Sequence, residues 1–395
     1  MPPMDARDEA AYAARVRAWA GDLRTGSTRT WRDFLDAPVT DVQTADDGPL
    51  PGAAQLELVR RLADGDAPIP RFAELADLVA TTAGPGRGLV DAPLPWPSRR
   101  TVGTPAVEPD ELPAEELLRA SAGVLARLLT PEAAIPAPRR PAAWRPWRRG
   151  FTLLGAPTTV ELVRGALLQR GLREGGSRTT WFVLGGPLED LMAQRWSARV
   201  RAGAGLRWQR LWRTAATNDR LPPAIELPTI ARYVSDQFDP ARVHVVLAEE
   251  PGQALAAVAE VLGVPAGTLG PTADVLATDL LRRVNPVLGL AVGEEARRRV
   301  VDRVWPEIAG GEPVAPLGAP AAQLDWAVAA GERMADALRA GRYAVHGDPA
   351  LVVPTRRSDV RRVPDPDAVL EHALRVVARA WQRYTQRSTE RGVQP

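Results

Sequence analysis

Hydrophobic positions follow two different patterns along the chain. Up to about residue 130 they recur at helical spacing, as Leu56, Val59 and Leu62 do within residues 55–63, and this spacing indicates amphipathic helices. From residue 151 onward, short continuous apolar runs alternate with helical stretches. Continuous apolar strands are typical of a parallel sheet that is covered on both faces. The pattern therefore predicts an α/β fold with a small parallel sheet flanked by helices, preceded by a mainly helical N-terminal region.

The same patterns give a predicted order of elements. Strands are expected at residues 151–154, 179–184 and 243–247. Helices are expected at residues 1–36 (interrupted by a polar loop), 55–63, 72–81, 113–129, 158–169, 188–200, 230–238, 253–262, 274–287, 293–304, 321–340 and 367–383. The predicted domains are a helical region at 1–130, a linker at 131–150, an α/β domain at 151–388 and a tail at 389–395.

The most informative stretch is the bend at residues 155–159, Gly-Ala-Pro-Thr-Thr. It follows the first predicted strand and opens the helix at 158–169. A helix start of this kind presents free N–H groups and a partial positive charge, which suit a phosphate. The candidate ligand-binding residues are Gly155, Ala156, Thr158 and Thr159.

Two residue types are missing from the chain. All 50 basic residues are Arg, and neither Lys nor Cys occurs. Without Lys there is no Schiff base to pyridoxal phosphate and no lysine to meet a transferring phosphoryl group. Without Cys, disulfides, thiol nucleophiles and Cys-ligated zinc are excluded. No run of 18 apolar residues and no signal peptide is visible, so no membrane span and a cytoplasmic location are expected.

The predicted linker at 131–150 contains five Pro, five Arg and two Trp. Five prolines forbid a regular helix and favour an extended chain. Arg and Trp both stack on nucleic-acid bases, but the net charge of the whole chain is only +2. We favour a semi-rigid linker over a nucleic-acid interface, because such an interface generally needs a larger basic field.

One sequence pattern occurs twice. Trp19, Arg24, Gly26 and Trp31 recur at the same spacing 177 residues later, as Trp196, Arg201, Gly203 and Trp208. In both places a helix is expected to end near the Gly and an aromatic segment to follow. A duplicated substructure and a chance match in an Arg- and Trp-rich chain both stay open, because a true repeat extends over a whole supersecondary unit.

Other chemistry receives little support. The three histidines, His244, His346 and His372, are scattered in the sequence without metal-ligand spacing, so no metal site is predicted. Two acidic pairs, Glu189-Asp190 and Glu249-Glu250, precede or open predicted helices. Acidic residues at a helix start favour the helix dipole, and we interpret both pairs in that way.

Several stretches in the second half, taken in order, resemble the P-loop sulfotransferases, in particular an actinobacterial sulfotransferase-like group. The bend is similar to the phosphosulfate loop of that family, and residues 186–196 and 201–211 resemble the segments that follow. Residues 240–246, 280–285 and 341–354 are similar to its later parts, so the resemblance covers about residues 150–385. Residues 24–28 also look like the loop, but they follow a helical run and are interpreted as a chance match.

The resemblance implies a cofactor and a site. The cofactor would be 3′-phosphoadenosine 5′-phosphosulfate, lying across the bend and the end of the second strand at Gly186, with Thr158 and Thr159 as phosphate ligands. The departures are substantial. The lysine of the family's loop is missing, its 3′-phosphate Arg falls on Gly186, and its Ser falls on Gln194.

Losing one preorganised donor commonly costs on the order of 10²–10³ in rate, so little catalysis is expected here. The sequence predicts a divergent, catalytically impaired sulfotransferase-like protein that retains at most weak nucleotide or anion binding, with no identifiable catalytic residue. The alternative is a non-enzymatic scaffold that binds a protein partner through its Trp- and Arg-rich helices.

Overall fold

The computed structural model describes residues 6–37, 50–65, 67–82, 94–96, 106–135, 150–176, 179–269, 274–310, 317–355 and 360–390. The chain divides into two compact units. Unit 1 combines residues 1–136, 283–308 and 365–395, and unit 2 combines residues 137–282 and 309–364. Each unit is therefore built from separate stretches of the chain.

Unit 2 contains a five-stranded sheet in which every pair of neighbouring strands is parallel. Its strands are β1 (Gly150–Gly155), β2 (Arg173–Glu174), β3 (Thr179–Gly185), β4 (Val243–Leu247) and β5 (Ala344–His346), in the spatial order β2-β1-β3-β4-β5. The chain runs outward from β1 in both directions, so the strand order reverses between β1 and β3. In open parallel sheets, ligands bind outside the carboxyl ends of the strands at such a switch point.

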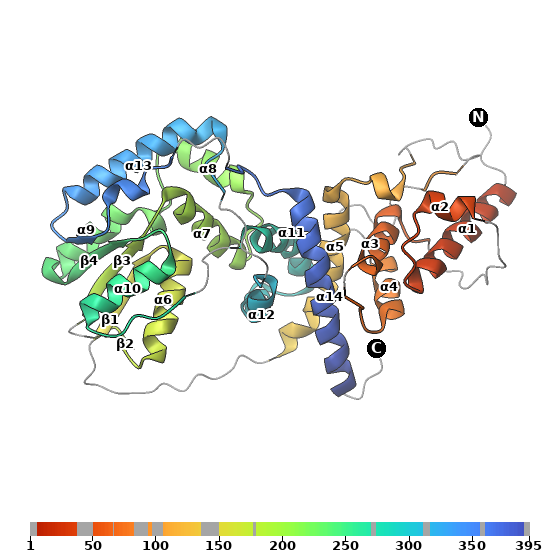
Figure 1. Cartoon of the computed structure of the whole chain (residues 1–395), viewed down its shortest axis with the longest axis horizontal. Helices are drawn as coiled ribbons and strands as arrows, with labels where there is room; N and C mark the ends of the chain where they lie inside the picture. The colour runs from red at the N-terminus through yellow and green to blue at the C-terminus, as the bar shows by residue number, and fades with distance from the viewer. Residues whose placement is uncertain are drawn as a thin grey trace. The chain divides into compact units, whose positions relative to one another are not determined.

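Helices cover both faces of this sheet (Figure 1). On one face, α6 (Pro157–Gln169) and α10 (Pro251–Leu262) pack into a shared apolar core. The sheet contributes alternate strand residues to this core: Phe151, Leu153, Phe182, Leu184 and Val246. On the other face lies α9 (Leu227–Gln237), whose Leu227 side chain occupies the space that a Cβ at Gly185 would need. Unit 2 also holds α7 (Leu188–Arg201), α8 (Trp208–Thr217) and α13 (Leu324–Arg339).

Unit 1 is helical in its described residues. It contains α1 (Ala6–Arg24), α2 (Trp31–Asp36), α3 (Ala53–Ala63), α4 (Phe72–Ala80), α5 (Ala114–Leu129), α12 (Glu294–Ile308), α14 (Pro366–Glu390) and the end of α11 (Val275–Ala291). The C-terminal helices are hydrogen-bonded to the N-terminal part of the chain. The indole of Trp381 on α14 donates to the carbonyl of Pro70 at 2.8 Å. Buried Glu132 accepts from Arg387 of α14 and also lies 3.5 Å from Arg303 of α12.

The three predicted strands and the predicted helices are present, with small shifts at their ends. The two outer strands, β2 and β5, were not predicted, and helix α8 was expected only as the aromatic segment that follows Gly203. The predicted domain division is wrong at the C-terminal end, because α12 and α14 pack into unit 1 and not into an α/β domain at 151–388. Of the predicted linker, residues 131–134 lie in a 3₁₀ turn (Thr130–Ala134) instead of an extended chain, and residues 136–149 lie outside the described residues.

The two copies of the repeated sequence pattern fold in the same way, one in each unit. In the first copy, the indole of Trp19 on α1 donates to the carbonyl of Arg29 at 3.1 Å. In the second copy, the indole of Trp196 on α7 donates to the carbonyl of Leu206 at 2.6 Å. Both bonds span ten residues, and both bring the first Trp of the copy against the second, with ring centroids 5.3 and 5.7 Å apart.

The turn between the two helices is also shared. Gly26 has φ +91° and Gly203 has φ +100°, a backbone conformation that favours glycine. Each glycine N–H donates to a carbonyl three residues earlier, at Leu23 and at Val200. A Gly in this conformation just after a helix satisfies the last free carbonyls of that helix.

An extended segment crosses each copy at the same place. The backbone N–H of Leu94, which precedes a proline, donates to the Tyr12 hydroxyl at 3.1 Å. The backbone N–H of Ala319, which also precedes a proline, donates to the Glu189 carboxylate at 3.3 Å. Tyr12 and Glu189 occupy equivalent positions of the two copies, again 177 residues apart. The similarity of the two copies therefore extends beyond the sequence match to a contact with a segment outside it.

The copies differ at the second Trp. Trp31 donates from its indole to the carbonyl of Pro95 at 3.0 Å. The equivalent indole of Trp208 is buried and has no partner among the described residues.

Candidate functional site

The bend at residues 155–159 lies where the sequence predicted it, at the carboxyl end of β1 and the start of α6. Gly155 has φ +98°, and a Cβ there would come 2.2 Å from the carbonyl oxygen of Leu184 on β3. Glycine is therefore required at this position. The next residue, Ala156, donates its N–H to the same carbonyl at 2.9 Å.

The N–H groups that should receive a phosphate are already bonded. The side-chain oxygen Oε1 of Gln194 accepts from the backbone N–H of Thr158 at 3.1 Å and of Thr159 at 3.0 Å. The Thr159 hydroxyl also lies 3.2 Å from this oxygen. Pro157 has no N–H, and Val160 donates to the carbonyl of Ala156. The neutral amide oxygen of Gln194 thus lies where a bound anion would place its oxygen.

Gln194 is placed by α7, which follows β3. Its side chain is buried, with 5% of its surface exposed. Buried polar groups at a helix start need partners, and this arrangement satisfies the amide oxygen and the N-terminal N–H groups of α6 together. Sequence reasoning placed Gln194 where the resembling family has Ser, but it did not identify Gln194 as a cap. The two positions are 35 residues apart, and only the pairing of β1 with β3 brings them together.

Gly186 lies at the end of β3, beside the backbone that follows β4. A Cβ there would come 2.5 Å from the carbonyl oxygen of Ala248. No side chain fits at this position, so an arginine could not stand there without a shift of the backbone. Of the predicted site residues, the structure brings Gly155, Ala156, Thr158 and Thr159 to one end of the sheet, with Gly186 on the neighbouring strand.

The surroundings of the bend are acidic. Asp190, one helical turn before Gln194 on α7, is largely buried, and this burial, together with Glu189 and Glu249, raises the pKa of its carboxyl from 3.8 to about 6. A carboxyl with such a perturbed pKa marks a dry site of negative potential. Helix capping alone, as the sequence suggested for these residues, does not account for that environment.

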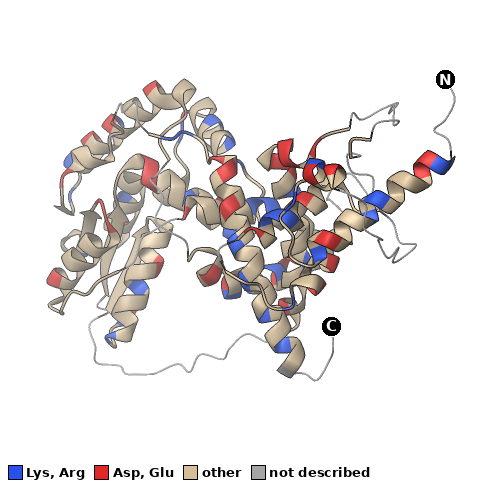
Figure 2. Cartoon of the chain, turned by 45° about the vertical axis from the view of Figure 1, so that its right-hand side comes forward, with Lys and Arg blue, Asp and Glu red and all other residues tan. Residues whose placement is uncertain are grey.

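Two arginines of unit 2 that could supply positive charge are paired with carboxylates. Arg164 of α6 pairs with Glu174 of β2 at 2.9 Å, and Arg201 pairs with Glu161 at 2.6 Å. Elsewhere, acidic and basic residues are interspersed along the described helices of both units (Figure 2). The bend therefore combines the backbone geometry of an anion site with a neighbouring helix that carries a buried carboxyl of raised pKa.

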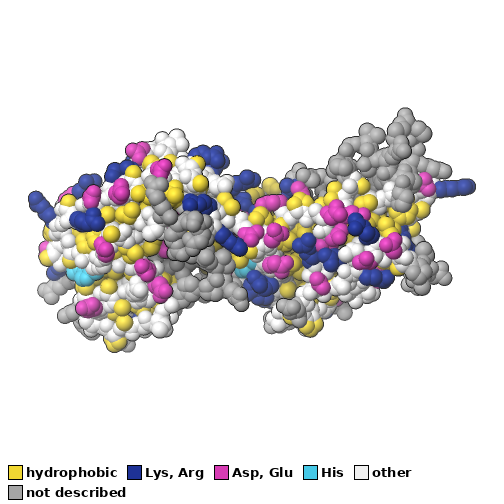
Figure 3. Space-filling view, turned by 45° about the horizontal axis from the view of Figure 1, so that its top comes forward, with side chains coloured by type: hydrophobic (Ala, Val, Ile, Leu, Met, Phe, Trp, Pro, Cys, Tyr) yellow, Lys and Arg dark blue, Asp and Glu magenta, His cyan; other side chains and the backbone are white. Residues whose placement is uncertain are grey.

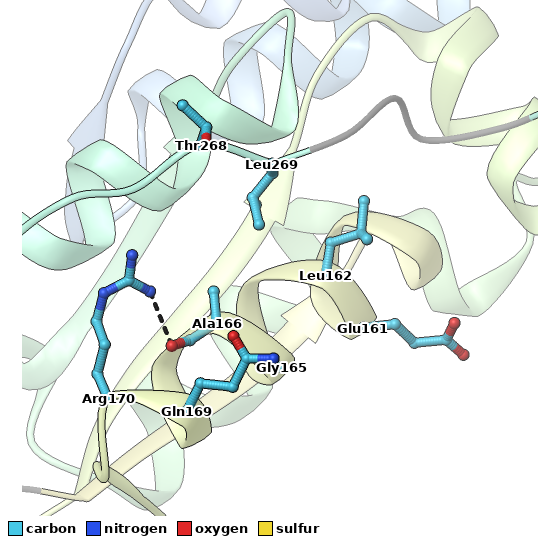
Figure 4. Close-up of a pocket in the computed structure, with 8 residues that line it drawn as sticks. All are labelled: Glu161, Leu162, Gly165, Ala166, Gln169, Arg170, Thr268 and Leu269. Carbon is cyan, nitrogen blue, oxygen red and sulfur yellow. Dashed lines mark hydrogen bonds between the residues drawn. The ribbon is translucent and has the colours of Figure 1, made fainter. Parts of the chain in front are cut away.

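A cavity of about 500 Å³ lies on the outer side of α6, away from the bend. Its lining comes from α6 and from the loop after α10 (Figure 4): Glu161, Leu162, Gly165, Ala166, Gln169, Arg170, Thr268 and Leu269. Arg170 donates to the carbonyl of Ala166 at 2.7 Å, and Glu161 is held by Arg201. The two charged groups of the lining are therefore engaged within the chain.

Six tryptophans of the helices are interior residues. Trp19, Trp31, Trp196, Trp208, Trp212 and Trp381 are each 2% exposed or less. Two others, Trp305 of α12 and Trp326 of α13, are half-buried. A partner that binds the Trp-rich helices would therefore contact these two and not the six interior tryptophans.

Two of the three histidines, which the sequence separates widely, lie side by side in the structure. His244 and His346 are 102 residues apart in sequence, yet their rings meet across β4 and β5 with Nδ1 of His244 and Nε2 of His346 3.0 Å apart. The prediction that they are scattered is therefore wrong for this pair. Only the pairing of the unpredicted strand β5 with β4 creates it. Among the described residues, no three His, Asp or Glu side chains gather in a group that could hold a metal ion.

Comparisons with known proteins add no family assignment: no family model, curated protein or solved structure matches the chain. No helix among the described residues is long and apolar enough to cross a membrane.

Proposed function

We propose that the chain is a sulfotransferase-like α/β protein whose phosphate bend is filled by its own Gln194, so that it neither holds 3′-phosphoadenosine 5′-phosphosulfate nor transfers its sulfuryl group. The observation that carries this proposal is the acceptance of three donors, from Thr158 and Thr159, by one buried amide oxygen. The strand order and the position of the bend at a switch point support the kinship.

The energetic balance disfavours a nucleotide. Replacing the amide oxygen with a charged phosphate oxygen strengthens each hydrogen bond by about 1–1.5 kcal/mol, but a displaced, buried Gln194 amide costs about 1–3 kcal/mol. Immobilising the ligand costs at least about 4 kcal/mol. Asp190, Glu189 and Glu249 add repulsion, and the chain has no lysine to offset it. These terms leave no useful affinity.

A thermal-shift titration with 3′-phosphoadenosine 5′-phosphate tests the proposal. For the wild-type protein we expect no change in Tm at millimolar ligand. Gln194→Ser empties the bend, and ligand at five times its Kd should then stabilise the protein by about 1 kcal/mol, or about 2–4 °C for a unit of this size.

Gln253→Ala is the matched control. Gln253 also accepts from a backbone N–H at a strand end, that of Glu249 at 3.2 Å, but it lies after β4 and does not cap the bend. This variant should show no ligand shift. A clear shift in the wild-type protein contradicts the proposal, and no shift in Gln194→Ser shows that Gln194 is not what closes the site.

A further inference from the structure

His244 and His346 form a pair of imidazoles on neighbouring strands. His244 lies in β4 and pairs in register with Phe182 of β3, while His346 lies in β5 and pairs with Val246 of β4. Because alternate strand residues share a face, both rings lie on the sheet face that α6 and α10 cover. The nitrogens Nδ1 of His244 and Nε2 of His346 are 3.0 Å apart.

The sheet holds these rings in place and leaves them accessible. The His244 ring stacks on Phe182, with ring centroids 5.4 Å apart. Both histidines are half-buried, and Figure 3 shows that histidine side chains reach the surface of the chain. The pair is therefore held at one edge of the sheet with both side chains partly exposed.

The spacing of the two nitrogens suits a particular coordination geometry. With metal–nitrogen bonds of about 2.0–2.1 Å, nitrogens 3.0 Å apart subtend about 91–97° at a metal. Tetrahedral coordination needs a separation of about 3.3 Å with the same bonds. Adjacent positions of a square-planar or tetragonal site need about 90°, which is the geometry of Cu²⁺ and Ni²⁺.

We propose that His244 and His346 form a two-imidazole site for a divalent first-row cation of the Cu²⁺ or Ni²⁺ type, with water or an external ligand in the remaining positions. The proposal is independent of the function of the bend. For both lone pairs to point at one metal ion with these bond lengths, each must turn by about 40–45° away from the line that joins the two nitrogens. The N–H that one ring now donates moves to the other nitrogen of the same ring, so a neutral pair binds metal without releasing a proton.

Metal ligation requires a neutral imidazole. The third histidine, His372, is fully buried in unit 1, and the chain has no Cys. The pair is thus the main candidate for nitrogen ligation.

Calorimetric titration of the whole protein with CuCl₂, NiCl₂ and ZnCl₂ tests the site. We expect one ion per chain and tighter binding of Cu²⁺ than of Ni²⁺ or Zn²⁺, the usual order for such ligands. The electron paramagnetic resonance spectrum of the Cu²⁺ form should show coupling to two nitrogens. His244→Phe, which keeps the stacking on Phe182, and His346→Asn should each weaken Cu²⁺ binding by more than about tenfold, a loss above about 1.4 kcal/mol.

Glu250→Gln is the control, because Glu250 is an exposed carboxylate after the same strand. It should leave the affinity unchanged. Binding that survives in a folded His244→Phe/His346→Asn double variant, a spectrum with one nitrogen, or no binding by the wild-type protein overturns the assignment. Circular dichroism of each variant establishes that it is folded.

Discussion

The raised pKa of Asp190 predicts how unit 2 responds to pH. Asp190 binds its proton more tightly in the folded protein than in the unfolded chain, since its carboxyl pKa rises from 3.8 to about 6. Its contribution is therefore fully favourable below about pH 4 and is lost as the pH rises through 6. A shift of this size corresponds to about 3 kcal/mol, and partial exposure of the side chain reduces it to about 1–3 kcal/mol.

Asp190→Asn mimics the protonated carboxyl at every pH. We expect this variant to match the wild-type stability at pH 3, where Asp190 is protonated in both the folded and the unfolded chain, and to exceed it by about 1–3 kcal/mol at pH 8. Urea unfolding followed by circular dichroism at the two pH values measures the difference. Glu250→Gln, which removes an exposed carboxylate from the same end of the sheet, should show no such dependence. An Asp190→Asn effect that is equal at both pH values would refute a buried carboxylate in a negative environment.

Two further predictions concern single residues. Trp31→Phe leaves the Pro95 carbonyl without its donor, whereas Trp208→Phe removes a buried donor that has no described partner. Trp31→Phe should therefore lower the free energy of unfolding by about 1–3 kcal/mol more than Trp208→Phe. Equal losses in urea unfolding would contradict the difference between the two copies. Gly155→Ala places a Cβ 2.2 Å from a carbonyl oxygen at φ +98° and should lower the free energy of unfolding by about 1–3 kcal/mol, measured as a lower Tm. The control Gly252→Ala places a Cβ that meets nothing within 4 Å and should not lower the Tm. An unchanged Tm for Gly155→Ala would show that the bend is looser than described.

The central strands were predictable because their sequences carry the signal. Residues 243–247 are a continuous apolar run, and such a run is buried wherever it lies in a parallel sheet. The outer strands carry no such signal. Arg173 and Glu174 are exposed and charged, and residues 344–346 are too short and mixed to be recognised. These strands exist because β1 and β4 offer free backbone groups for pairing, which a local pattern does not record.

The predicted domain boundary failed for a related reason. The hydrophobic stripe of α14 shows that one of its faces is buried. It does not show that the partner is α5, more than 200 residues earlier, and not the adjacent sheet. Contacts such as that of Trp381 with Pro70 arise from the fold as a whole.

The backbone elements of the candidate site were predicted from the sequence, but the side chain that fills it was not. The strand, the Gly-Ala-Pro bend and the helix start could be located because each has a local rule. Whether the helix start is open depends on Gln194, a residue of the next helix. The histidine pair depends in the same way on two strands that lie far apart in sequence.

The division of unit 1 into separate stretches affects how the chain is made. Helix α5 ends roughly 240 residues before α14 begins, and synthesis at about 5–20 residues per second separates them by on the order of 10–50 s. During that interval the apolar face of α5 has emerged from the ribosome without its partner, while the central strands of unit 2 are already available. The nascent N-terminal helices are therefore the part of this chain that chaperones have the longest opportunity to bind.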